Sequence, residues 1–113
     1  MVEPVKITRR YCSISNQSQH LLVIIAVSKN IDDPISIAQE CISCPFTMTD
    51  IIRRRFPNNV SVNTLYPDAT HRFTYELYKD WKFVVSRVDK FQPLILECKR
   101  EEFYVIKPED VSQ

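Results

Sequence analysis

The sequence contains no glycine in its 113 residues. The loops that cradle phosphate groups in P-loop proteins and in dinucleotide-binding folds need glycine, because the backbone there approaches the ligand closely. The absence of glycine therefore excludes both kinds of nucleotide site. It also predicts that tight turns are made by Asn, Asp and Pro instead.

Net charge and long apolar runs are lacking as well. The formal net charge is +1, so the chain has no long-range field for a polyanion. Residues 21–27 form an apolar run that stops after seven residues, and a membrane-spanning helix needs about 20. The first residues lack the apolar stretch of a secretory signal. We expect a cytoplasmic or nuclear protein with no membrane partner, folded as a single domain over residues 1–113.

Short runs of alternating or continuous apolar residues predict a mainly β domain. We expect strands over residues 6–15, 20–27, 60–65, 71–78, 81–87, 94–98 and 102–106. The first two are expected to pair as a hairpin and the later ones to form an antiparallel meander. The predicted fold is an antiparallel β-sandwich of about 6–7 strands, with two short helices inserted between strands 2 and 3.

The helical insertion is predicted from a change in period. Asp33 and Pro34 predict a helix start, and apolar residues then recur at three- and four-residue spacings over residues 34–43. A second short helix is predicted over residues 49–55. The expected core comprises Leu22, Ile24, Ala26, Ile37, Cys41, Phe73, Trp81, Phe83, Leu94, Leu96, Phe103 and Val105.

A spaced pattern runs through residues 64–107. It consists of Thr64-Leu65, Pro67, Arg72, Trp81-x-Phe83, Leu94-x-Leu96 and Glu102-x-x-Val105. In order and spacing this pattern resembles the β-domain of the von Hippel-Lindau tumour suppressor family, the substrate-recognition subunit of an elongin-cullin ubiquitin ligase. The resemblance implies a β-sandwich fold and a bias toward peptide or protein binding.

The same resemblance does not carry the family's ligand. The family's hydroxyproline pocket is lined by Tyr, His, Ser, His and Trp, and of these only Trp81 is retained. Thr74, Tyr75 and Lys79 stand at the positions of the first His, the Ser and the second His, and Val62 stands at that of the Tyr. Hydroxyproline binding is therefore not expected here.

The main functional hypothesis is a non-enzymatic module that binds a protein or peptide. Surface aromatic residues commonly anchor protein interfaces, and we expect a binding face of Thr74, Tyr75, Tyr78, Lys79 and Trp81. An open strand edge, where main-chain groups can pair with an added strand, is the other expected mode. No catalytic residue, cofactor or small-molecule substrate is predicted. The two histidines, His20 and His71, lie in predicted strands without a recognisable catalytic signature.

Four cysteines leave a first alternative open. Without an export signal we expect them to be reduced, buried thiols. Cys41 and Cys44 form a C-x-x-C pair, the spacing of thiol redox proteins, although at the C-terminal end of a helix the dipole does not favour a thiolate. With Cys12 and Cys98 the pair could complete a structural zinc site.

Nucleic-acid binding is the second alternative. Arg9-Arg10, Arg53-Arg54-Arg55 and Lys99-Arg100 could form a basic patch. Phosphate-backbone binding needs an excess of such charges on one face. The chain has 15 basic and 14 acidic residues, and this balance disfavours a nucleic-acid partner.

Overall fold

The computed structural model describes residues 9–43, 54–55 and 58–112, and this part of the chain is mainly β. Its strands are β1 (Tyr11–Asn16), β2 (Leu22–Val27), β3 (Val60–Leu65), β4 (Thr70–Thr74), β5 (Lys82–Arg87), β6 (Leu94–Glu97) and β7 (Glu102–Ile106). Its helices are α1 (Pro34–Ser43), the single turn α3 (Tyr75–Tyr78) and a 3-10 turn over Pro108–Val111. None of the helices in these ranges is long and apolar enough to cross a membrane.

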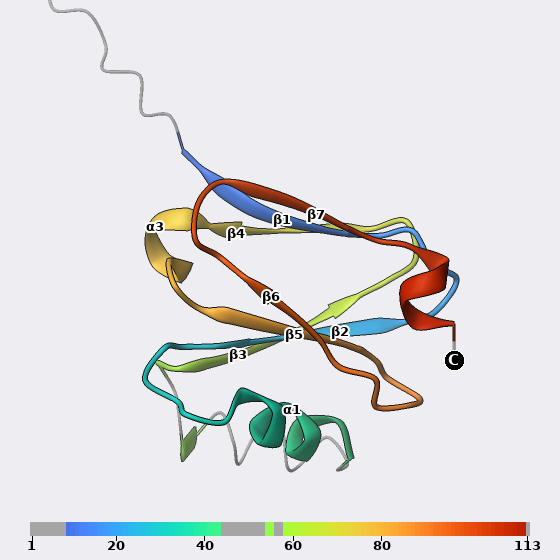
Figure 1. Cartoon of the computed structure of the whole chain (residues 1–113), viewed down its shortest axis with the longest axis horizontal. Helices are drawn as coiled ribbons and strands as arrows, with labels where there is room; N and C mark the ends of the chain where they lie inside the picture. The colour runs from blue at the N-terminus through green and yellow to red at the C-terminus, as the bar shows by residue number, and fades with distance from the viewer. Residues whose placement is uncertain (1–8, 44–53, 56–57, 113) are drawn as a thin grey trace, which may run out of the picture.

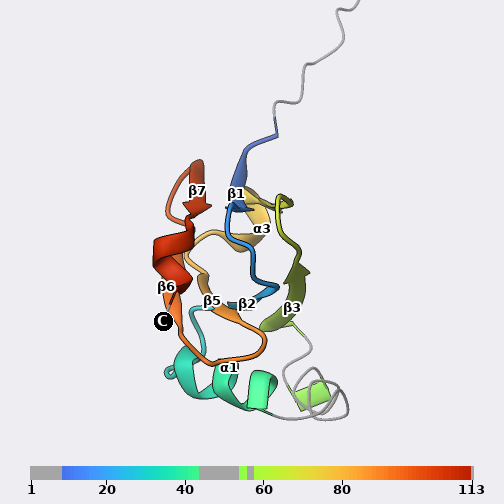
Figure 2. The same cartoon turned by 90° about the vertical axis from the view of Figure 1, so that its right-hand side faces the viewer.

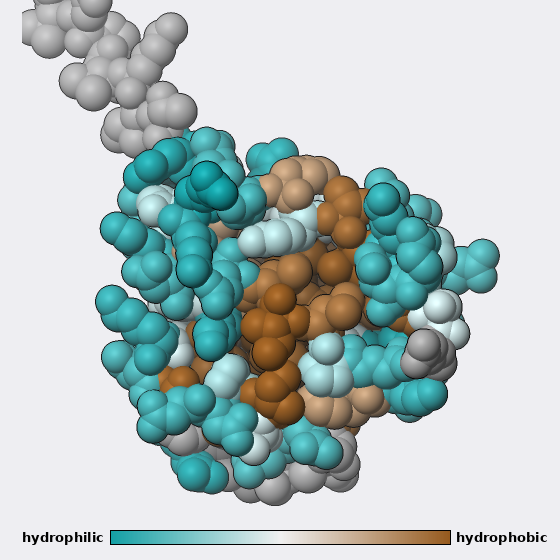
Figure 3. Space-filling view, viewed as in Figure 1, coloured by the Kyte–Doolittle hydropathy of each residue, from teal (hydrophilic) through white to brown (hydrophobic). Residues whose placement is uncertain are grey.

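The strands form two sheets that face each other (Figures 1 and 2). One has three strands in the order β4-β1-β7, and the other has four in the order β3-β2-β5-β6. Side chains from both sheets meet in one buried cluster, which includes Cys12 and Ile14 of β1, Ile24 of β2 and Phe83 of β5. Figure 3 shows apolar side chains gathered between the two sheets, with hydrophilic ones around them.

A second cluster explains why β2 is apolar on both of its faces. Ile25 of β2 and Val84 of β5 point away from the first cluster and pack against Ala38 and Cys41 of α1. The helix begins as predicted, with Asp33 accepting a hydrogen bond from the Ser36 backbone N–H at 3.1 Å. The predicted helix over residues 49–55 lies mostly outside the described residues.

The predicted hairpin of the first two strands is wrong, because β1 and β2 belong to different sheets. The polar segment between them forms a corner built on Asn16. Its side-chain amide donates to the carbonyl oxygens of His20 and Leu65, at 2.8 and 3.0 Å, and its Oδ1 accepts from the Ser18 N–H at 2.9 Å. A buried side chain that replaces main-chain partners lets the chain leave one sheet for the other.

The predicted meander is also wrong, since the chain changes sheet between β3 and β4, between β4 and β5, and again between β6 and β7. Among consecutive strands of the predicted meander, only β5 and β6 pair, antiparallel. The fold is not wholly antiparallel either, because β1 and β7 run parallel, with Cys12 opposite Glu102.

Two predicted details fail near the surface. The strand expected over residues 71–78 ends at Thr74, and α3 follows it. In β7 the predicted inward residues are shifted by one position: Phe103 is 67% exposed, whereas Ile106 is buried. Because side chains alternate along a strand, a shift of one residue exchanges the two faces.

Most of the predicted core is found inside. Buried members are Leu22, Ile24, Ala26, Cys41, Phe73 and Phe83, and those half-buried against a core cluster are Ile37, Trp81, Leu94 and Leu96. Phe103 is the clear error, and Val105 is half-buried on the outer side with it.

The tight turns use aspartate, as the lack of glycine predicts. Asp68 and Asp80 adopt left-handed backbone conformations, with φ of 64° and 65°. Aspartate tolerates this region better than most residues because its short polar side chain can bond locally.

Candidate functional site

The residues of the predicted aromatic binding face do not share one surface in the structure. Tyr75 is only 8% exposed, and its hydroxyl donates to the Lys99 carbonyl oxygen at 3.2 Å. Its ring also lies 4.4 Å from the Arg10 guanidinium. Tyr75 is therefore a core residue and not a surface anchor. Of the other predicted members, Thr74 is half-buried at the end of β4 and Lys79 is exposed.

Tyr78 and Trp81 remain partly accessible and pack against other aromatic rings. Phe73 stacks on Phe83 with ring centroids 4.5 Å apart, and Tyr78 meets Phe73 edge-on at 4.9 Å. Trp81 in turn meets Tyr78 edge-on at 4.9 Å. The backbone is also fixed here, because the Cys98 N–H donates to the Trp81 carbonyl oxygen at 3.1 Å. These contacts hold one side of both rings against the core and leave the other side open.

The open side of the two rings lines a hollow of about 280 Å³. We call it the β3 hollow; its lining residues are Asn58, Val60, Ser61, Leu77, Tyr78 and Trp81. Leu77 of α3 is 66% exposed at its rim. The Ser61 hydroxyl is buried and has no hydrogen-bond partner within the described part of the chain.

Sequence reasoning found two residues of this hollow and missed the others. A strand over residues 71–78 would place Leu77 on the same face as Phe73 and Tyr75, because side chains alternate along a strand. The turn of helix at 75–78 places Leu77 at the surface instead. Val60 and Ser61 lie on β3, and no local signal links them to Trp81. Only the pairing of β3 and β5 with the two edges of β2 brings these segments together.

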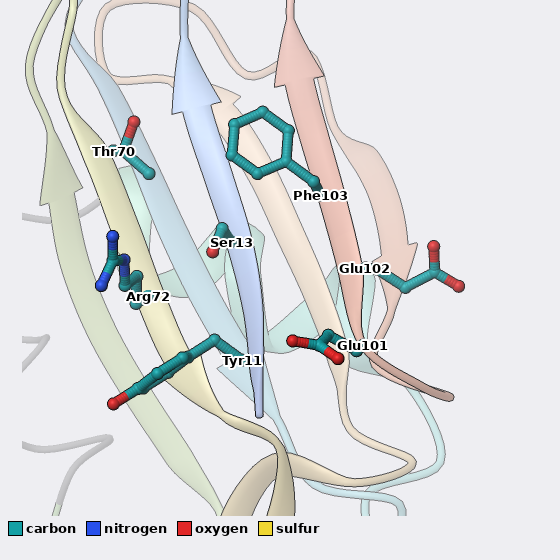
Figure 4. A pocket seen from close by; sticks show the side chains of 7 residues that line it. All are labelled: Tyr11, Ser13, Thr70, Arg72, Glu101, Glu102 and Phe103. Atoms are coloured by element: carbon teal, nitrogen blue, oxygen red, sulfur yellow. The ribbon is translucent and has the colours of Figure 1, made fainter. Parts of the chain in front are cut away.

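A larger hollow of about 910 Å³ lies on the outer face of the three-stranded sheet. We call it the outer trough, and it is lined by Tyr11, Ser13, Arg72, Glu101 and Phe103 among others (Figure 4). Arg72 was noted in the sequence pattern as a fold residue. Here its side chain lies on the open face, 5.6 Å from the Tyr11 ring centroid.

The cysteines do not gather at one centre. Cys12 and Cys98 form a disulfide with Cα atoms 6.1 Å apart, so the expectation that all the cysteines are reduced is wrong. Cys41 is buried in the second cluster, under α1 and away from the Cys12–Cys98 bond, and Cys44 lies outside the described residues. Within the described ranges no group of three or more His, Cys, Asp or Glu side chains is placed to hold a metal ion.

The histidines are also separated. His71 lies in β4 with its ring 4.5 Å from that of Phe73, and burial lowers the pKa of its imidazole below the ordinary 6.5. His20 follows the Asn16 corner, and its carbonyl oxygen accepts the Asn16 amide. Neither imidazole forms a hydrogen bond with a serine, threonine or cysteine side chain in the part of the chain described; the Ser18 hydroxyl accepts only from the His20 backbone N–H.

Several of the predicted basic residues are paired with carboxylates. Arg10 contacts Glu76 at 3.0 Å, Lys99 contacts Glu97 at 3.1 Å, and Arg100 contacts Glu102 at 3.0 Å. These pairs reduce the local positive charge that phosphate binding would need.

No known family model, curated protein or solved structure matches this chain.

Proposed function

We propose that this protein is a non-enzymatic binding module that takes up an extended protein or peptide segment along the β3 edge, with one side chain of the segment in the β3 hollow. The observation that carries the proposal is the composition of the β3 hollow, which lies beside the terminal strand of the four-stranded sheet. A largely exposed leucine and two core-supported aromatic rings surround a buried serine hydroxyl that has no partner in the described structure. Such a surface offers apolar contact and one oriented polar group, the usual make-up of a recognition pocket.

Among the four edge strands described, β3 has the length and composition best suited to pairing with an added strand. Natural edge strands are commonly blunted by short length, charged residues or proline. β6 has four residues, β4 carries Arg72, and β7 begins with Glu102. β3 has six residues, Val-Ser-Val-Asn-Thr-Leu, with no charge and no proline. It is the terminal strand of its sheet (Figure 2), and no described strand pairs with its outer side.

Strand addition at β3 would combine the two binding modes expected from the sequence, contact with an aromatic face and pairing with a strand edge. Main-chain hydrogen bonds to β3 would supply affinity without regard to sequence, and alternate side chains of the partner would supply specificity. Covering Leu77 contributes about 1.5 kcal/mol, which corresponds to roughly tenfold in affinity.

Panning of a random peptide library displayed on phage tests the proposal. Enriched peptides would be titrated against the protein with intrinsic fluorescence as the signal, because Trp81 is the single tryptophan of the chain. Leu77→Asp is expected to weaken binding at least tenfold. Tyr66→Asp, a matched change at a site 64% exposed beyond the other end of β3, should leave it unchanged. Equal binding by both variants, or no enriched peptide, would remove the β3 hollow as the site.

We also propose that the two facing sheets form a β-sandwich related to the von Hippel-Lindau β-domain. In support, Leu65 ends β3, Arg72 lies in β4 and Phe83 lies in β5, so the spaced pattern falls on successive strands. An experimental structure superposed on that β-domain tests the relation, and strands paired in a different order would refute it.

The predicted cytoplasmic or nuclear location remains a proposal. Its support is the sequence alone, and the Cys12–Cys98 disulfide opposes it, because disulfides persist mainly in oxidising compartments. Imaging of the tagged full chain would decide between a cytoplasmic or nuclear location and an oxidising compartment.

A further inference from the structure

The outer trough owes its shape to the size of three side chains in one row. Ser13 of the central strand β1 lies opposite Arg72 of β4 on one side and opposite Phe103 of β7 on the other. A small side chain between two large ones leaves a depression along the middle strand, and Figure 4 shows Arg72 and Phe103 on either side of Ser13.

This face differs from the outer face of the other sheet. The four-stranded sheet is covered by α1, whose Ala38 and Cys41 pack on Ile25 and Val84. No described element packs on the outer face of the three-stranded sheet, and Phe103 keeps 67% of its surface exposed there. An exposed aromatic side chain at a depression is a common feature of binding surfaces.

The two walls of the trough carry opposite, unpaired charges. Arg72 has no carboxylate within ion-pair distance among the described residues, in contrast to Arg10, Arg87 and Arg100. Glu101 likewise has no described basic partner, while its neighbour Glu102 is held by Arg100. Arg72 lies on the β4 side and Glu101 on the β7 side (Figure 4).

The dimensions decide which kind of partner fits. β4 and β7 flank β1, so their side chains lie about 10 Å apart at the usual strand spacing. An extended chain covers that distance in about three residues, whereas the charges of a single amino acid are far closer together. The sheet face itself, three strands of five or six residues, covers roughly 250 Å². A standard interface between folded proteins needs about 800 Å² per partner.

We propose that the outer trough binds a short extended segment of a partner protein that carries one acidic and one basic side chain about three residues apart, with an apolar side chain between them. The acid pairs with Arg72, the base pairs with Glu101, and the apolar side chain lies over Ser13 against Phe103. The site is on the opposite sheet from the β3 hollow and does not depend on it.

Titration with defined peptides, followed by amide NMR shifts of the full chain, tests this proposal. The probe is the capped tetrapeptide Glu-Ser-Leu-Lys, and the comparison peptides replace its Lys by Glu or its Glu by Lys. Saturable shifts centred on Ser13 and Phe103 are expected with the probe, at least tenfold weaker with either comparison peptide.

Charge reversal in the protein supplies the second readout. Arg72→Glu should weaken the probe about tenfold, and the double variant Arg72→Glu, Glu101→Arg should restore it, because the segment can then bind in the opposite direction. Lys82→Glu, a reversal on the other sheet, and Leu77→Asp, in the β3 hollow, should have no effect.

Three results would overturn the proposal. The first is the absence of saturable NMR shifts with the probe, and the second is comparison peptides that bind as tightly as the probe. The third is failure of the double variant to regain the wild-type affinity for the probe. Concentration-dependent self-association that Arg72→Glu abolishes would also overturn it, since the trough would then hold a second copy of the chain.

Discussion

Removal of the Cys12–Cys98 disulfide should lower the free energy of unfolding more than replacing any other two small side chains would. The bond connects β1, in one sheet, to the residue that follows β6, in the other, and spans 86 positions of sequence. Both cysteines are fully buried. Closing so long a loop removes much of the unfolded chain's freedom, and the loop-entropy relation gives about 4.6 kcal/mol. This is a large fraction of the roughly 5–15 kcal/mol by which domains are usually stable.

The double variant Cys12→Ala, Cys98→Ala is therefore expected to unfold at lower denaturant concentration, with about 2–5 kcal/mol less free energy of unfolding. Its melting temperature should fall by roughly 10 °C or more. Guanidinium unfolding followed by circular dichroism measures the change. Reductant should destabilise the wild-type protein in the same way and leave the double variant unaffected.

Cys41→Ala is the matched control, because Cys41 is a buried cysteine outside the disulfide. This variant should lose less stability and keep the response to reductant. The bond can also be observed directly, since trypsin releases residues 11–29 and 91–99 as separate peptides only after reduction. Stability within 1 kcal/mol of wild type in the double variant, or a non-reduced digest without the linked pair, would refute this reasoning.

Two further predictions concern the core and the response to pH. Phe83→Ala removes a fully buried ring and should cost about 3–5 kcal/mol, whereas Phe103→Ala should cost less than about 1 kcal/mol; similar losses in urea unfolding would contradict the observed facing of β7. The pKa of the His71 imidazole is lowered by burial, so the unfolded chain binds the proton more readily and stability falls as the pH drops below about 6.5. His71→Gln should show a smaller loss between about pH 7.5 and 5.5, and identical pH profiles would remove His71 as a cause.

Local features of the fold could be predicted from the sequence, and its long-range pairings could not. The strand positions, the Asp33 start of α1 and the aspartate turns follow from periodicity, capping and backbone preference, which act over a few residues. The hairpin prediction failed at Asn16, because the same polar segment suits a hairpin turn and a crossing between sheets. Phe103 and Tyr104 are both aromatic, so hydrophobicity alone does not determine which of them faces inward. Tyr104 is the one held, through its hydroxyl, to the Glu97 carbonyl oxygen at 2.7 Å.

The candidate site was accessible to sequence reasoning only in part. Trp81 and Tyr78 could be chosen because aromatic residues next to polar ones often anchor partners. Tyr75 could not be separated from them, since the carbonyl oxygen that accepts its hydroxyl belongs to Lys99, a residue 24 positions away. Nothing in the sequence around Ser61 or Ser13 indicates that either serine lies in a hollow. Their importance comes from the larger side chains that the strand pairing places around them.

The pairing of β1 with β7 also fixes an order in time. Residues near Cys12 find their parallel partners about 90 residues later, near Glu102. At a synthesis rate of roughly 5–20 residues per second, β1 has no β7 to join for at least about 5 s. The three-stranded sheet therefore closes last, after the four-stranded sheet has its strands, and folding should be slow for a domain of this size because its contacts are non-local. Until then the edge of β1 that pairs with β7 has no partner strand, and this is the interval in which a chaperone would have an unpaired strand edge to bind.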